Sequence, residues 1–129
     1  MKKNLRLKTD RRRYPRIVQA LPLKVVADGY DLSTTTENIS CIGAYCRLDR
    51  YIPPFTKIAV RLTLPIPDKK TGRYTEVECK GVVVRTEDNN KNGFNIAIYF
   101  NEIKENQRKK ISRYINQFLP QDTSDLKRS

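Results

Sequence analysis

Arginine residues are concentrated in residues 11–16, which read RRRYPR. A guanidinium group is planar and permanently charged, so it can hold a phosphate, or the O6 and N7 edge of guanine, through two parallel hydrogen bonds. Pro15 disfavours helical geometry at Tyr14, and in an extended chain Arg12 and Arg16 point to the same side, roughly 13 Å apart. The spacing predicts a paired anion-binding site, although a solvated basic arm would have the same composition.

A second polar cluster follows about twenty residues later in NISCIG, residues 38–43. Asn38 and Ser40 are two positions apart, so both should lie on one face at the end of a strand. Gly43 follows at a position where the backbone can turn or a ligand can approach closely. Asn and Ser offer short donors and acceptors suited to the edges of a base. An ordinary polar strand end before a turn would give the same pattern.

Catalytic and metal-binding constellations are difficult to assemble from this composition. The chain has no histidine, which removes the commonest general base and metal ligand. Its three cysteines, Cys41, Cys46 and Cys79, cannot all pair and fall on apolar, strand-like stretches. We therefore expect no enzymatic activity, no metal site, no bound cofactor and no disulfide framework.

The net charge of +12 is unevenly distributed. Residues 1–16, called the arm below, hold eight basic residues and one acidic residue, whereas residues 17–101 hold eleven basic and nine acidic residues. Such an arm favours an anionic partner: nucleic acid, nucleotide or acidic lipid. No apolar run approaches the roughly 18 residues that span a bilayer, so we expect a cytoplasmic protein without membrane insertion.

Six short strands and one helix should position these residues within a single domain of 129 residues. Strict alternation in KIAVRLTLP and FNIAIYF indicates strands with one buried face. The predicted strands cover residues 21–27, 31–39, 44–48, 57–65, 74–85 and 94–100. An amphipathic helix is predicted over residues 101–119, with Asn101 as its N-cap and Pro120 as its stop. The pattern predicts an all-β, antiparallel barrel with the helix on its open end or side.

Together the two polar clusters resemble the signature motifs of the PilZ domain family, RxxxR followed by [D/N]xSxxG. Here these are Arg12 to Arg16 and Asn38 to Gly43. The resemblance covers a core of about residues 11–119, since GVVVR, GFNIAIYF and the closing helix also look like that family's pattern. The tail, residues 120–129, and the first part of the arm fall outside it. The resemblance implies a six-stranded antiparallel barrel that binds cyclic di-GMP and signals to an effector protein.

The same resemblance implies roles for individual residues. Arg12 and Arg16 would contact guanine edges and phosphates, Asn38 and Ser40 would address a guanine base, and Gly43 would shape the turn. The family more often has aspartate where this chain has Asn38, so the affinity should differ. Arg11 precedes the arginine pair, and an extra cation there favours two stacked ligand molecules.

Charge suggests how a signal would arise. Seven net positive charges within sixteen residues repel one another, and a dianionic ligand would give the arginines a common partner and order the arm against the barrel. Tyr14 is expected to pack on its own domain. Two alternatives remain open: a small nucleic-acid-binding barrel, which exposed stacking aromatics would support, and a PilZ-like interaction domain that does not bind nucleotide.

Overall fold

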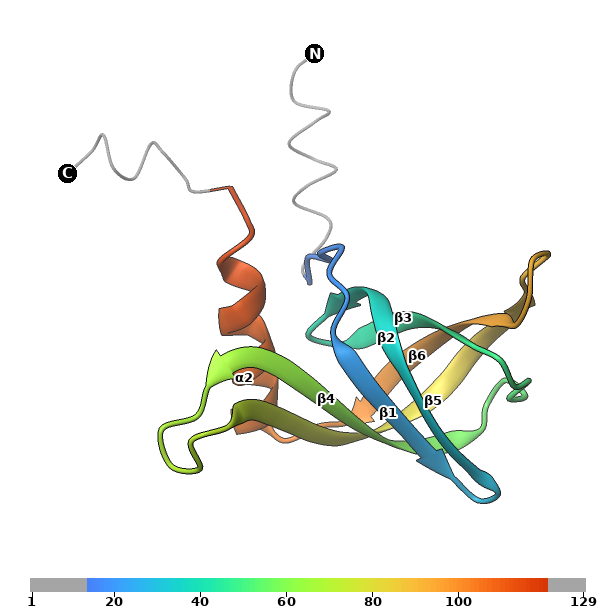
Figure 1. Ribbon diagram of the computed structural model, residues 1–129, viewed down its shortest axis with the longest axis horizontal. Coiled ribbons are helices and arrows are strands. Elements are labelled where there is room, and N and C mark those ends of the chain that lie inside the picture. The colour runs from blue at the N-terminus through green and yellow to red at the C-terminus, as the bar shows by residue number, and fades with distance from the viewer. Residues whose placement is uncertain (1–13, 121–129) are drawn as a thin grey trace, which may run out of the picture.

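The computed structural model describes residues 14–120, which form one closed antiparallel barrel of six strands (Figure 1). The order around the barrel is β1-β2-β3-β6-β5-β4, and pairing of β1 with β4 closes it. The strands are β1 Pro22–Ala27, β2 Tyr30–Ser40, β3 Gly43–Leu48, β4 Lys57–Pro67, β5 Tyr74–Asp88 and β6 Phe94–Glu102. The predicted fold class is confirmed, and all six predicted strands are present.

Alternation of apolar and polar residues sends one face of each strand into the barrel. In β4, Ile58, Val60 and Leu62 are at most 4% exposed, while Lys57, Ala59 and Arg61 at the alternate positions face solvent. The inward side chains of all six strands meet in a single core. Burial of these apolar side chains supplies the main stabilisation, and the pairing of β1 with β4 closes the barrel so that each of the six strands has two neighbours.

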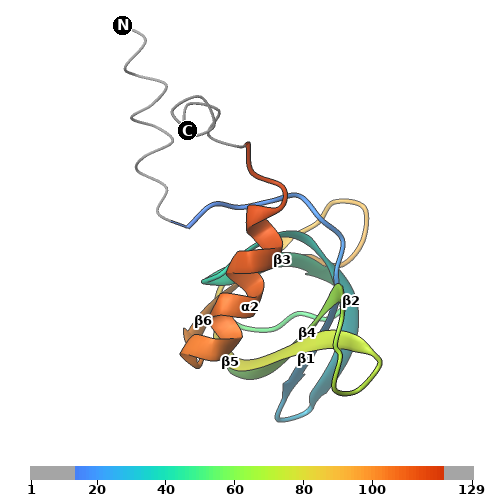
Figure 2. The ribbon, with the colours of Figure 1, turned by 90° about the vertical axis from the view of Figure 1, so that its left-hand side faces the viewer.

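Helix α2 (Glu105–Asn116) lies over one end of the barrel and contacts β2, β4 and β5 (Figure 2). It buries Ile111, Tyr114 and Ile115, as its amphipathic pattern predicts. Within the described residues, no helix has the length and apolar character needed to cross a membrane.

The predicted start of the helix at Asn101 is wrong. Strand β6 continues to Glu102, which pairs with Lys80 of β5, so the backbone of this segment belongs to the sheet. Lys104 occupies the N-cap position and makes no side-chain capping hydrogen bond. Pairing with a neighbouring strand has outweighed the local capping preference of asparagine.

The segment between the arm and β1 is held on β2 by two sets of hydrogen bonds. The backbone groups of Ile17 and Ile39 exchange two bonds of 3.0 Å. Further along, the Thr36 hydroxyl accepts from the Leu21 N–H at 2.9 Å and donates to the Gln19 carbonyl at 2.5 Å. Thr36 is only 2% exposed, so these bonds satisfy backbone groups that water reaches poorly.

Replacing Thr36 with valine tests this anchoring. Thr36→Val keeps the side-chain shape but leaves the Leu21 N–H and the Gln19 carbonyl without their partner. We expect the free energy of unfolding to fall by about 1–3 kcal/mol, measured by urea denaturation. The matched control is Thr35→Val at the exposed neighbouring position, which should change stability by less than about 0.5 kcal/mol. Equal effects of the two substitutions would contradict the anchoring role.

Candidate functional site

The folded chain brings together residues from the two polar clusters that are far apart in the sequence. The guanidinium of Arg16 donates a hydrogen bond of 2.8 Å from Nη1 to Oδ1 of Asn38. The Ile17–Ile39 pairing produces this proximity, because it lays residues 16–18 antiparallel to the end of β2. Arg11 and Arg12 lie outside the described residues, so of the three predicted arginines only Arg16 is placed.

Arg16 and Asn38 stand at a cleft of about 330 Å³ on the outer surface of the barrel. Its other walls come from the outward faces of β3, β6 and β5, where Tyr45, Ala97 and Arg85 follow one another across the paired strands. Tyr99, which is 46% exposed, lies one outward position further along β6. The cleft can accommodate a planar group between aromatic and cationic side chains.

Gly43 lines the cleft as the first residue of β3. A Cβ atom at this position would collide with the backbone carbonyl of Ile98 on β6. The absence of a side chain therefore lets the two strands approach closely at the cleft, since a backbone neighbour cannot move aside as a flexible side chain can.

Ser40 differs from its predicted neighbours because it is 1% exposed and does not line the cleft. Its hydroxyl accepts a hydrogen bond of 3.2 Å from the Ile42 N–H. The bond holds the turn between β2 and β3, on which Asn38 and Gly43 depend for their positions. Ser40 therefore contributes to the site indirectly, by holding the turn that positions Asn38 and Gly43.

Tyr45, Arg85 and Tyr99 are site residues that the sequence analysis missed. Tyr45 is half-buried and Arg85 and Tyr99 are exposed, as are many other surface residues, so burial expected from the local sequence does not single them out. Only the order β3-β6-β5 around the barrel makes the three strands neighbours at this point. The sequence around each residue can indicate whether its side chain is exposed, but it cannot show which residues line the same cleft.

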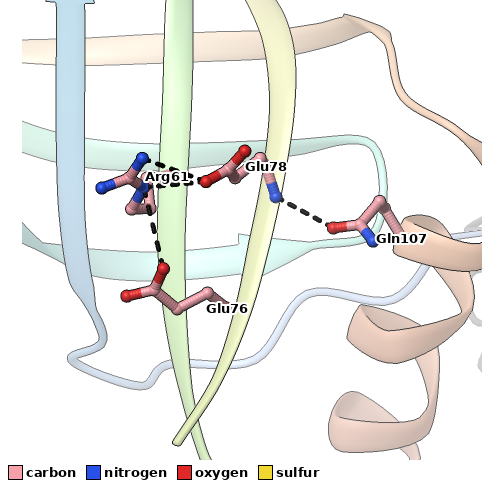
Figure 3. A network of polar contacts seen from close by, with 4 residues as sticks. All are labelled: Arg61, Glu76, Glu78 and Gln107. Carbon is pink, nitrogen blue, oxygen red and sulfur yellow. Dashed lines mark hydrogen bonds and ion pairs between the residues drawn. The ribbon is translucent and has the colours of Figure 1, made fainter. Parts of the chain in front are cut away.

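A larger groove of about 1160 Å³ lies between β1, β4, β5 and the start of α2. Its charges cancel, because four acidic and four basic residues line it. Arg61, for example, bonds Glu78 at 3.0 Å and lies 3.8 Å from Glu76, and the Glu78 N–H donates to the Gln107 side chain (Figure 3). Such mutually paired charges leave little net field for an anionic ligand.

The smaller cleft has the opposite electrostatic character. Among the residues that the structure describes, Arg16 and Arg85 are the charged ones in its lining, and none of these lining residues carries a carboxylate. Arg85 does contact a carboxylate outside the cleft, since its Nε lies 3.4 Å from Glu87, but its side chain stays 60% exposed. An anion is therefore favoured at this cleft over the larger groove, despite the difference in volume.

Two of the three cysteines, Cys46 and Cys79, are poor nucleophiles. Burial, aided by the nearby Glu37 carboxylate, raises the pKa of Cys46 to about 12, and burial raises the pKa of Cys79 to about 12. Both thiols therefore remain protonated at neutral pH and lack the reactive thiolate form. Across residues 14–120 no cluster of three or more potential metal-ligating side chains occurs.

Comparison with known proteins agrees with this architecture. The fold is similar to the structure of the Bacillus subtilis inhibitor of motility, MotI/DgrA, with a TM-score of 0.72 and 18% identity over 82% of this chain and 50% of that chain. The chain thus spans about half the length of MotI/DgrA. It is also similar to the PilZ domain with c-di-GMP of YcgR from Escherichia coli, with a TM-score of 0.57 and 17% identity over 83% of this chain and 90% of that chain.

Sequence comparison identifies the family directly. The comparison with curated proteins gave no match. The PilZ domain family, in contrast, matches residues 10–117, a span that includes both polar clusters and the cleft between them. The chain therefore belongs to the PilZ domain family.

Proposed function

We propose that this protein is a receptor for cyclic di-GMP that has no catalytic activity of its own and transmits the signal by contacting an effector protein. The observation that carries the proposal is the Arg16–Asn38 hydrogen bond of 2.8 Å, which joins the two family motifs at a cationic cleft. Family membership and the similar fold of the YcgR domain, whose structure contains c-di-GMP, support the same ligand.

In the proposed complex one guanine occupies the cleft. Tyr45 and Tyr99 offer aromatic surface, and Arg16 offers a fork of donors for the guanine edge or a phosphate. Asn38 provides the polar contact to the base. Gly43 has no side chain and so leaves room for the base, and Ser40 holds the turn between β2 and β3. Arg85 adds a second cation on the opposite wall.

The arm completes the proposed site. The phosphates would draw Arg11 and Arg12 toward Arg16, because these cations otherwise repel one another and gain a shared counter-ion on binding. Arg11 supplies the additional charge that two stacked ligand molecules, with four phosphates, would require. The ordered arm would present a new surface to the effector protein.

Alanine substitution of the motif arginines tests the ligand. Isothermal titration calorimetry with cyclic di-GMP should show binding to the unmodified protein, with about two ligand molecules per chain. Arg12→Ala and Arg16→Ala should each weaken binding by at least about 2 kcal/mol, roughly thirtyfold, because each removes a charge-assisted contact with a phosphate or guanine.

The control Arg73→Ala removes the same charge from the exposed turn between β4 and β5, and it should bind nearly as the unmodified protein does. GTP, linear pGpG and a single-stranded oligonucleotide should bind far more weakly. Tight binding to many oligonucleotides that weakens steeply with salt would support the nucleic-acid alternative instead. A flat titration with cyclic di-GMP would refute the receptor proposal.

Asn38 can be tested by two substitutions with different chemistry. Asn38→Ala removes the acceptor for Arg16 and should weaken binding about tenfold. Asn38→Asp keeps that acceptor and can also accept from the N1–H and N2–H groups of guanine, so it should bind at least as tightly as the unmodified protein. If calorimetry shows that both substitutions weaken binding equally, the side chain acts on the base as a donor, contrary to the proposed contact.

Limited proteolysis tests ordering of the arm. Trypsin cleaves after arginine, and residues 11–13 offer three adjacent sites. Saturating cyclic di-GMP should slow cleavage there by at least about fivefold, since a protease needs the chain locally free. Cleavage after Arg73 in the same sample serves as the internal control. Equal rates at residues 11–13 with and without ligand would show that binding leaves the arm unchanged.

A further inference from the structure

The loop between β3 and β4, residues 49–56, presents an aromatic side chain to solvent (Figure 1). Phe55 is 80% exposed and has a φ of 74°, and within residues 14–120 it is the one non-glycine residue with a positive φ. A bulky L-residue rarely adopts this conformation, because its Cβ atom comes too close to a backbone carbonyl oxygen. Backbone strain and exposed apolar surface therefore coincide at one position.

Several hydrogen bonds hold this loop in its conformation. The Phe55 N–H donates to the Val83 carbonyl at 2.6 Å, and the Val83 N–H donates to the Thr56 carbonyl at 2.9 Å. The Thr86 hydroxyl donates to the carbonyl of Ile52 at 2.6 Å, and Ile52 is fully buried. A strained residue persists only where the surrounding structure fixes it, and such residues are concentrated at functional sites. The loop thus fixes the Phe55 backbone while the ring stays in solvent.

Phe55 lies beside the cleft. Its hydrogen bond joins it to the β5 backbone, which is one strand spacing, about 5 Å, away. The register of β5 against β6 shifts between Val83 and Arg85, which leaves Val84 as a bulge residue. Val84 and Arg85 are both exposed, and both line the cleft. Val84 therefore connects the surface of the cleft to the loop that carries Phe55.

The proposed ligand is larger than the cleft. Cyclic di-GMP has two guanines, two riboses and two phosphates, whereas the cleft of about 330 Å³ is at the lower end of the range of about 300–1,000 Å³ for sites of drug-sized ligands. One guanine in the cleft therefore leaves the rest of the ligand outside it. Arg16 stands at the β2 side of the cleft, and Phe55 lies next to its β5 side.

We propose that Phe55 and Val84 form a second base subsite next to the cleft, in which a guanine of cyclic di-GMP that the cleft does not hold stacks on the Phe55 ring. This inference rests on the proposed function and adds a contact with the same ligand. A side chain whose backbone is already fixed loses little conformational entropy when a base stacks on it, so the exposed ring contributes to affinity.

Substitutions that differ in aromatic character test the stacking. In calorimetry with cyclic di-GMP, Phe55→Ala should weaken binding about tenfold, because the stacking surface is lost. Phe55→Leu keeps apolar surface without a ring and should weaken binding about fivefold, whereas Phe55→Trp should bind at least as tightly as the unmodified protein.

The matched control is Tyr74→Ala, which removes an aromatic side chain that is 59% exposed at the start of β5. It should change the affinity less than about twofold, as expected for a surface position away from the ligand. An effect of Phe55→Ala no larger than that of Tyr74→Ala, or an unchanged affinity in Phe55→Leu, would overturn the stacking subsite.

Stability separates this role from a structural one. Phe55→Gly removes the Cβ atom and with it the strain at positive φ, so the melting temperature should rise by about 2–4 °C. The same substitution should weaken cyclic di-GMP binding at least as much as Phe55→Ala does. A residue that served only the fold would lower the melting temperature when it is replaced. A lower melting temperature of Phe55→Gly, or an unchanged affinity, would contradict the proposal.

Fluorescence reports on the subsite directly. The chain has no tryptophan, so Phe55→Trp introduces a single indole at this position. A stacked guanine should quench its emission at least about twofold at saturating cyclic di-GMP, and the control Tyr74→Trp should show no such change. If the unmodified protein does not bind cyclic di-GMP, the proposed function fails and this inference with it. If it binds but the emission of Phe55→Trp does not change, only the subsite is refuted.

Discussion

The pairing of Ile17 with Ile39 is the interaction on which the site depends. Two backbone hydrogen bonds of 3.0 Å fix the end of the arm against the end of β2. Ile17 is 7% exposed and Ile39 fully buried, so the pairing also joins the hydrophobic core. It brings Arg16 and Asn38, which are 22 positions apart in the chain, within hydrogen-bonding distance. A loop of that length is closed here by burial and backbone hydrogen bonding together.

Closure of the barrel determines the electrostatic character of the cleft and of the larger groove. The paired strands β3, β6 and β5 place Tyr45, Ala97 and Arg85 side by side and leave a small cationic cleft. On β1, β4 and β5 the outward charges include both signs, and some pair with one another, as Arg61 does with Glu76 and Glu78. The cleft is therefore the better site for an anion, because the electrostatic field of the lining residues, and not the volume, determines where a charged ligand is stabilised.

Much of the fold could be predicted because its signals are local. Alternation identified the clearest strands, as at Ile58 to Leu64, and turn signals separated the others; the six-stranded barrel with a closing helix is confirmed. The start of the helix was wrong because Glu102 pairs with Lys80, a partner that no capping preference can reveal. The site was only partly predictable: Arg16, Asn38 and Gly43 do line one cleft, whereas Ser40 is buried and holds a turn.

By itself, the sequence determined the strand faces, the basic arm and the two motifs that mark the family, since each depends on neighbours within a few positions. The tertiary structure alone decided that Tyr45, Arg85 and Tyr99 share the cleft and that Gly43 makes room for the Ile98 carbonyl. These arrangements depend on the order and register of strands around a closed barrel. Register is set by the packing of the whole core, so no short stretch of chain encodes it.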